Sequence, residues 1–271
     1  MTNKLTIHQG NNLHVLQTLP SDEFNLVYAD PPFNTGVTQK RKRVKKGEHL
    51  LNESKLAFAD KFDDFIPWLR ARVEEIHRVM TPDGSFFLHM DYREIHYAKV
   101  MCDEIFGRRN MVNEIVWTYD FGARAKKKWS AKHDTILWYV KDLKEHTFNY
   151  DEVDRVPYKA PELVRRTAKN AEEKIARGKT ITDVWTDNIV HTMSKERTGY
   201  PTQKPMTILG RIVRVHSNPD DKLLDPFAGS GSFGEAALKH GRNVVLIDEN
   251  PEAVKVMEKR LERFRPIKTS P

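Results

Sequence analysis

The chain has 271 residues, of which 39% are hydrophobic, so it can bury a full core as one large α/β domain, with or without an insertion. Its net charge of +7 and isoelectric point of about 9.3 favour a polyanionic partner. With one cysteine, no zinc-ligand spacing, no signal core and no membrane-spanning run, we expect a cytoplasmic protein without disulfide, catalytic metal or membrane contact.

The first elements predict the start of an α/β fold. Residues 4–8 alternate weakly and predict a short strand, which ends in turn residues. A helix over about 12–19 leads to an apolar stretch, 24–29, which is typical of a buried strand.

That second strand runs directly into Asp30-Pro31-Pro32-Phe33. The prolines fix the backbone and remove two donors, so a carboxylate, rigid carbonyl acceptors and an aromatic face converge. Asp30 and the Pro31 carbonyl can accept the hydrogens of an exocyclic amine while Phe33 stacks on the ring that carries it. The alternative is a plain strand-ending turn, which Asp and Pro also favour.

Residues 37–60 show little periodicity and include a basic run with Arg41 and Arg43. Such a long loop predicts a phosphate-contacting or lid role, and a solvated charge run is the alternative. Helical spacing then predicts a helix over 64–80, which Pro82-Asp83-Gly84 ends, and a strand over 85–89.

The next helix follows Asp91 and Glu94, which resemble a capping box, and it carries Cys102 on its core face. Strands are predicted over 112–118 and 135–140. The basic residues between them, Lys126 and Lys127 among them, lie beside Trp129. This mixture suits nucleic acid, although a hydrated hairpin loop looks the same.

The alternation of predicted strands and helices is interrupted between residues 141 and 199. A helix over about 161–177 is net basic and carries Arg165 and Arg166. We interpret the segment as an inserted recognition region that contacts phosphates, with an ordinary solvated helix as the alternative.

A second informative stretch follows an apolar strand at 222–225 and consists of Asp225-Pro226-Phe227-Ala228-Gly229-Ser230-Gly231. The glycines let the backbone approach a ligand, and Asp248, at the end of the next strand, can accept hydrogen bonds from ribose hydroxyls. A dinucleotide fingerprint also fits loosely, but Asp225 is placed to meet a cationic amino group rather than a pyrophosphate.

The last helix begins after Asn250 with Pro251 at its first position, and no further strand is predicted after it. The strand at 4–8 can complete this half of the sheet. The predicted fold is therefore a doubly wound sheet of permuted order, in which Asn11 lies near the cofactor pocket.

These motifs resemble those of the β-group of amino-methyltransferases that act on DNA, including the modification subunits of type III restriction systems. The resemblance rests on DPPFNTG at Asp30, the turn after Asp225, the segment 200–205, and the stretches 86–92 and 133–137. It covers nearly all of the chain outside the loop after Gly36 and the region 141–199.

The resemblance implies a seven-stranded Rossmann-like methyltransferase sheet and S-adenosyl-L-methionine as the methyl donor. Residues 1–140 would form the catalytic half, 141–199 a target-recognition insertion, and 200–271 the cofactor half. The implied catalytic residues are Asp30, Pro31, Pro32 and Phe33. The implied cofactor residues are Asn11, Lys204, Asp225, Phe227, Gly229, Ser230, Gly231 and Asp248.

In this assignment Lys204 approaches the methionine carboxylate of the cofactor, although a surface lysine before a helix would look the same. Two positions depart from the family pattern: Phe33 replaces the more usual Tyr, and Asn11 stands where an acid is common.

The implied reaction is methylation of adenine N6 in double-stranded DNA after the base is flipped out. Cytosine N4, an RNA substrate and a non-catalytic DNA-binding subunit are the alternatives. A homodimer and a partner restriction endonuclease are also compatible with the resemblance.

Overall fold

The computed structural model describes residues 4–36, 60–122, 124–190, 194, 196–264 and 267–269. No helix in these ranges combines the length and the apolar character needed to cross a membrane.

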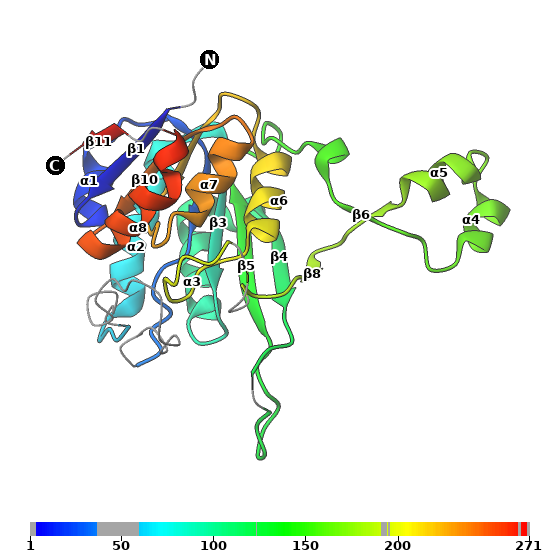
Figure 1. The fold of residues 1–271 in the computed structure, drawn as a ribbon, viewed down its shortest axis with the longest axis horizontal. Helices are drawn as coiled ribbons and strands as arrows, with labels where there is room; N and C mark the ends of the chain where they lie inside the picture. Colours follow the sequence, from blue (N-terminus) through cyan, green and yellow to red (C-terminus); the bar gives the residue numbers. More distant parts are fainter. Residues whose placement is uncertain are drawn as a thin grey trace.

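A single large sheet organises the chain (Figure 1). In spatial order it is β11-β1-β10-β9-β2-β3-β5-β4-β8, and among these nine strands only β5 runs antiparallel to its neighbours. The strands are β1 (Leu5–Gln9), β2 (Phe24–Ala29), β3 (Met80–Met90), β4 (Met111–Thr118), β5 (His133–Val140), β8 (Val184–Thr186), β9 (Lys222–Asp225), β10 (Asn243–Asp248) and β11 (Ile267–Thr269).

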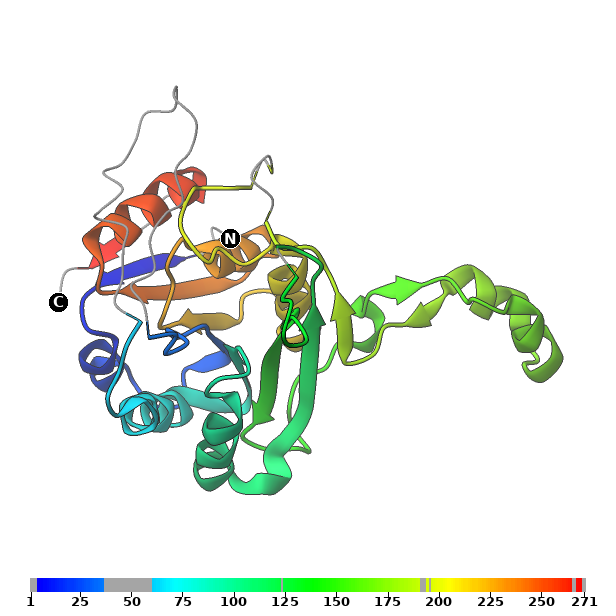
Figure 2. The same ribbon diagram turned by 90° about the horizontal axis from the view of Figure 1, so that it is seen from below.

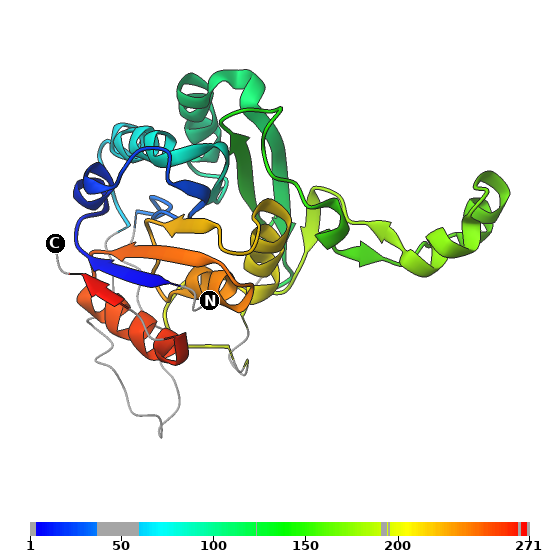
Figure 3. The ribbon, with the colours of Figure 1, turned by 90° about the horizontal axis from the view of Figure 1, so that it is seen from above.

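Helices cover both faces of the sheet, which Figures 2 and 3 show nearly edge-on. One face packs against α1 (Asn12–Thr18), α2 (Phe65–Val79) and α3 (Ile95–Cys102), and the other against α6 (Met206–His216), α7 (Ser232–Lys239) and α8 (Pro251–Leu261). Alternate residues along a strand pack against the two helix layers. In β2, Leu26 and Tyr28 join the second layer, whereas Val27 and Ala29 join the first. The predicted α/β fold class and its permuted strand order are thus confirmed.

The seven predicted strands are the seven inner strands of the sheet, and β8 and β11 add three residues each at its edges. The prediction that no strand follows the last helix was therefore wrong. Cys102 is fully buried, as its place on the helix predicted.

Three local predictions were also wrong: the turn at 82–84, the cap of α3 and the single helix over 161–177. Pro82-Asp83-Gly84 does not separate a helix from a strand, because β3 begins at Met80 and contains these residues as a bulge between Met80 and Ser85. Asp91 does not cap α3; its carboxylate instead accepts hydrogen bonds from Arg93.

The helix predicted over 161–177 is two short helices, α4 (Pro161–Thr167) and α5 (Ala171–Arg177). They form the tip of an arm that projects from the body in Figure 1. A two-stranded stem of β6 (Arg155–Val156) and β7 (Lys179–Thr180) connects this tip to the body. Neither helix has a buried residue. A single long helix would have no core to pack against here, whereas folding back lets α4 and α5 contact each other.

One arginine of α6 fastens both ends of this arm. Arg211 Nε donates to Asp154 Oδ2 at 2.7 Å, where the arm begins, and Arg211 Nη1 donates to Asp187 Oδ2 at 2.8 Å, where it returns. The guanidinium also lies 4.6 Å from the ring centroid of Trp185. The arm's base is therefore fixed by charge, although its tip is exposed.

We expect Arg211→Met to loosen the base of the arm, because Asp187 loses its cation and Asp154 keeps only its pair with Arg214. Amide hydrogen exchange over residues 154–187 should accelerate at least about fivefold, and the protein should lose roughly 2–3 kcal/mol of stability. Arg165→Met, which removes the exposed pair with Glu172 at the arm's tip, is the matched control and should leave stability and exchange nearly unchanged. Equal exchange in both variants would contradict this role.

Candidate active site

The site lies where the strand order of the sheet reverses. β2 and β9 are parallel neighbours, and the chain winds away from them in opposite directions along the sheet. The carboxyl ends of two such strands leave a crevice, which is where open α/β sheets bind ligands. Here the crevice is a cavity of about 810 Å³.

Both predicted motifs line this single cavity. The sequence-predicted residues on its wall are Asn11, Asp30, Pro31, Pro32, Phe33, Lys204, Asp225, Phe227, Gly229, Ser230 and Asp248. Gly231 is not among them. It has φ +71°, and a Cβ there would come within 2.9 Å of Met257 Cγ, so its glycine is required by the packing of α7 on α8.

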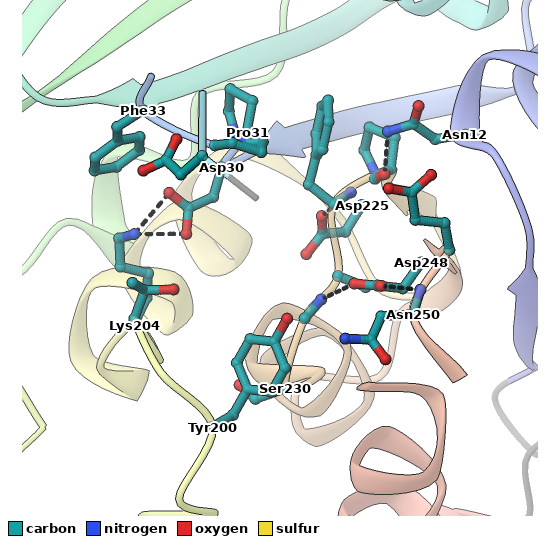
Figure 4. Close-up of a pocket in the computed structure, with 18 of the residues that line it drawn as sticks. Asn12, Asp30, Pro31, Phe33, Tyr200, Lys204, Asp225, Ser230, Asp248 and Asn250 are labelled. Carbon is teal, nitrogen blue, oxygen red and sulfur yellow. Dashed lines mark hydrogen bonds and ion pairs between the residues drawn. The ribbon is translucent and has the colours of Figure 1, made fainter. Parts of the chain in front are cut away.

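Asp30, immediately after β2, faces Lys204 (Figure 4). Lys204 Nζ donates to Asp30 Oδ1 at 2.6 Å and to Oδ2 at 2.5 Å, and it lies 4.9 Å from the ring centroid of Phe33. The side chains of Lys204 and Asp30 are only 9% and 16% exposed. The structure thus places this ammonium group on the predicted catalytic acid.

The backbone after the tetrad is held by Asn34, which has φ +53°, a conformation that Asn tolerates better than most residues. Its Nδ2 donates to Glu94 Oε1 at 2.8 Å, and its Oδ1 accepts from the Phe62 amide at 3.0 Å. Asn34 therefore ties the turn after Phe33 to the start of α3 and to the segment after residue 60.

A network of hydrogen-bonded, mostly buried polar side chains lies next to the same turn. His89 of β3 shares a hydrogen bond with the Tyr28 hydroxyl at 2.7 Å through Nδ1, and its Nε2 lies 3.3 Å from Asp134 Oδ2. Tyr119 donates to Asp134 Oδ1 at 3.0 Å, and the rings of His89 and Phe33 are 6.2 Å apart. Because each polar group has a partner, this hydrogen-bonded network can fix Tyr28 in the apolar core, beside Phe33 on the cavity wall.

On the other side of the cavity, Asp248 at the end of β10 braces the glycine-rich turn. Its Oδ2 accepts from the Gly229 amide and its Oδ1 from the Asn250 amide, both at 2.8 Å. Burial raises the pKa of Asp248 to about 6 despite these bonds. Tyr200 packs over the turn, since a Cβ on Gly229 would come within 3.0 Å of Tyr200 Cε1.

Asp225, the last residue of β9, is 3% exposed and accepts a hydrogen bond from the Phe227 amide at 2.9 Å. Burial raises its pKa well above the ordinary value, and the nearby carboxylates of Asp30 and Asp248 add to this effect. A cationic group of a bound ligand would oppose both effects, because it would favour the ionised form of the Asp225 carboxyl group.

The charged residues on the cavity wall include more acids than bases. The acids are Asp30, Asp60, Asp225, Asp248, Glu249 and Glu252, and the bases are Lys61, Arg72 and Lys204. The wall therefore favours a neutral or cationic ligand over a phosphate.

Sequence reasoning missed a group from α2 at one end of the cavity. The Arg72 guanidinium lies 3.9 Å from the Trp68 ring centroid, and its Nε donates to Asn12 Oδ1 at 2.7 Å. Asn12 Nδ2 in turn donates to the Pro226 carbonyl at 2.9 Å. The spacing of Trp68 and Arg72 by four residues was the available signal, because it puts both on one face of the helix.

The predicted DNA-contacting residues that the structure describes are not on the cavity wall. Lys126 and Lys127 are exposed on the hairpin between β4 and β5, which projects from the body in Figure 1. β2 and β4 run in the same direction, so this hairpin leaves the sheet at the edge where β2 ends. Arg165 and Arg166 are exposed on α4. Arg41 and Arg43 lie outside the described residues.

Comparison with known proteins identifies relatives of this architecture. A family model described as DNA methylase matches residues 24–259. The chain is 33% identical over 259 residues to the DNA adenine methyltransferase YhdJ of Escherichia coli K12, covering 95% of this chain and 82% of that protein. It is 28% identical over 273 residues to the type II methyltransferase M.ScaI of Streptomyces caespitosus, covering 96% and 82%.

Two solved structures share the fold. The cytosine-N4-specific PvuII DNA methyltransferase superposes with a TM-score of 0.66 at 14% identity, covering 96% of this chain and 87% of that one. The M1.HpyAVI complex with S-adenosyl-L-methionine gives 0.61 at 20% identity, covering 94% and 98%.

We expect Gly231→Ala to destabilise the protein by roughly 2–4 kcal/mol, because it adds an overlap with Met257 to the strain of a positive φ. Gly241→Ala is the matched control, since Gly241 has φ +78° with no atom within 4 Å of the added Cβ, and it should cost only about 1–2 kcal/mol. Urea unfolding measures both. Equal losses would show that Gly231 is fixed by its backbone angle alone.

The raised pKa of Asp248 predicts a dependence of stability on pH. A carboxyl group whose pKa rises from 3.8 to about 6 on folding favours the folded state at pH values below 3.8, and this contribution is lost as the pH rises through 6. Relative to Asp248→Asn, which does not titrate, the wild type should lose roughly 2 kcal/mol of unfolding free energy between pH 4.5 and 7.5. Urea unfolding at both pH values tests this, and parallel pH dependence of the two proteins would contradict it.

Proposed function

The chain belongs to the family of DNA methylases that modify N6 of adenine or N4 of cytosine, and from this premise we propose that it transfers a methyl group from S-adenosyl-L-methionine to adenine N6 in double-stranded DNA. The observation that carries the proposal is the meeting of Asp30 and the Gly229 turn in one cavity at the switch point of the sheet.

The cavity fits the proposed methyl donor in size and in charge. Its volume is in the range of sites that enclose a nucleoside-sized ligand. The excess of carboxylates suits a sulfonium and an ammonium group, and the Gly229 turn keeps side chains out of the space. When bound, S-adenosyl-L-methionine supplies an electrophilic methyl group on its sulfonium.

Each half of the cavity has its own task in this proposal. Asp225 faces the donor's ammonium group, Asp248 holds the ribose, and Asn11, Phe227 and Ser230 complete the wall of the cofactor half. Because Asp248 already orders the Gly229 and Asn250 amides, the ribose contact and the shape of the turn depend on the same carboxylate.

In the catalytic half, Asp30 and the Pro31 carbonyl accept hydrogens of the exocyclic amine, and Phe33 stacks on the base. Pro32 keeps the turn rigid and provides no competing donor. The amine nitrogen forms a bond to the methyl carbon as the carbon–sulfur bond breaks, which leaves S-adenosylhomocysteine, and the nitrogen releases one hydrogen ion to solvent. Positioning and exclusion of water supply most of the acceleration.

The basic residues outside the cavity are proposed to hold the DNA backbone. Lys126 and Lys127 extend from the catalytic edge. Arg165 and Arg166 lie on the arm of residues 154–187, which belongs to the segment 141–199 that we propose as the target-recognition region. Arg41 and Arg43 belong to the same proposal. Such contacts position the duplex without reading its sequence.

Two arguments support adenine over cytosine. Relatives that act on cytosine N4 more often have Ser at the position of Asp30, and the 33%-identical relative is named as an adenine methyltransferase. The homodimer and the partner restriction endonuclease stay predictions.

Asp30→Asn should lower methyl transfer by at least about 100-fold, because an acceptor of the reacting amine is lost. The assay measures labelled methyl groups transferred to unmethylated genomic DNA, and digestion to nucleosides identifies the base and the sugar. Binding of S-adenosylhomocysteine, measured by calorimetry, should persist in this variant.

The matched control for that experiment is Asp22→Asn, which removes the exposed pair with Lys141 just before the opposite end of β2 and should keep full activity. Undiminished transfer by Asp30→Asn would overturn the role of Asp30. N4-methylcytosine as the labelled product would replace the proposed base.

A further inference from the structure

Lys204 occupies both parts of the proposed base subsite. Its Nζ lies 2.5–2.6 Å from the two carboxylate oxygens of Asp30 and 4.9 Å from the ring centroid of Phe33. The acid that would accept the base amine and the ring on which the base would stack thus face one ammonium group. Figure 4 shows these three side chains converging beside the cavity.

This arrangement opposes entry of a base. An ammonium group bound to both carboxylate oxygens takes up acceptor capacity that the amine needs, and it competes for the same aromatic face. Because the side chains of Lys204 and Asp30 are only 9% and 16% exposed, water screens their attraction weakly. A base can enter only if the ammonium group moves.

The backbone around Lys204 is well anchored, so the movement falls to the side chain. Gln203 Oε1 accepts from the Thr198 amide and hydroxyl, both at 2.9 Å, and Gln203 Nε2 donates to the Glu196 carbonyl at 2.7 Å. The Met206 amide donates to Glu196 Oε2 at 3.2 Å. Only the flexible four-carbon stem of Lys204 is free to rotate.

The cavity that Lys204 lines continues into the cofactor half, past Tyr200 and Gly229. Two of the carboxylates in that half, Asp225 and Asp248, already accept hydrogen bonds from backbone amides, and Glu249 and Glu252 also line the cavity. A cofactor that carries an amino-acid end would bring one additional carboxylate into the space beside them. Lys204, which lines the same cavity, would then have an alternative partner to Asp30.

We propose that Lys204 closes the base subsite in the cofactor-free protein and is drawn from Asp30 to the carboxylate of the bound cofactor, which opens the subsite for the flipped base. This inference rests on the proposed function. It makes cofactor binding and base entry cooperative, and the coupling is reciprocal because each ligand favours the same position of Lys204.

The proposal can be tested by binding alone, with two probes that differ in the amino-acid end. S-adenosylhomocysteine has a carboxylate, and 5′-methylthioadenosine does not. Calorimetry with the full chain should show that Lys204→Met weakens binding of the first probe at least about tenfold and leaves the second within about twofold. Lys222→Met, which removes an ion pair with Glu23 at the opposite edge of the sheet, is the matched control and should change neither.

The decisive variant is Asp30→Asn, because it frees Lys204 in advance. We expect it to tighten binding of S-adenosylhomocysteine at least about fivefold, within the usual range of coupling between sites, without affecting 5′-methylthioadenosine. In a Lys204→Met background the gain should disappear. A gain that persists there would indicate simple charge repulsion by Asp30 and would overturn the proposal.

The other outcomes are also distinct. If Asp30→Asn leaves both probes unchanged, Lys204 does not move between the two carboxylates and the inference fails while the proposed function stands. If neither probe binds the wild-type protein, the proposed function itself fails. Thermal unfolding of each variant checks that the compared proteins are folded.

Discussion

The pairing of β2 with β9 is the constraint on which the site depends. Leu26 and Val27 lie beside Leu223 and Leu224 in a parallel register, so two strands from opposite ends of the chain finish at one edge of the sheet. All four side chains are fully buried. The hydrophobic effect that holds this register therefore also sets the distance between an acid after one strand and a glycine-rich turn after the other.

Much of this could be predicted because the inner strands are continuous apolar runs bounded by turn residues, a pattern that parallel sheets require. The edge strands β8 and β11 could not be predicted, because three residues are too few to show a hydrophobic pattern. They pair only because an inner strand is already present. The bulge at Pro82-Asp83-Gly84 was predicted as a turn between two elements. That prediction was wrong, because these residue types also occur in bulges and the continuation of β3 across them depends on pairing with β2.

The site also has parts that could be predicted from the sequence and parts that could not. Asp30, Asp225 and Asp248 could be found because each stands at the end of a predicted strand, and strand ends meet at one edge of the sheet. The partner of Asp30 could not be found by this logic. Lys204 precedes a helix and reaches Asp30 only through its side chain, across 174 positions of sequence. Contacts of this kind depend on packing and rotamers, which no local pattern specifies.

The distribution of charge explains how an acidic cavity can serve a partner that is itself an anion. The chain is net basic, but the cavity wall has more carboxylates than cations, and exposed lysines and arginines lie on the hairpin and the arm. In the proposed function, these projections attract the phosphates and the cavity repels them, whereas an uncharged base meets no such repulsion. Under the same proposal, a base enters the cavity only after it rotates out of the duplex, away from its phosphates. The pair between Lys204 and Asp30 fits this division, because it places a cation on the carboxylate that we propose to accept the base amine.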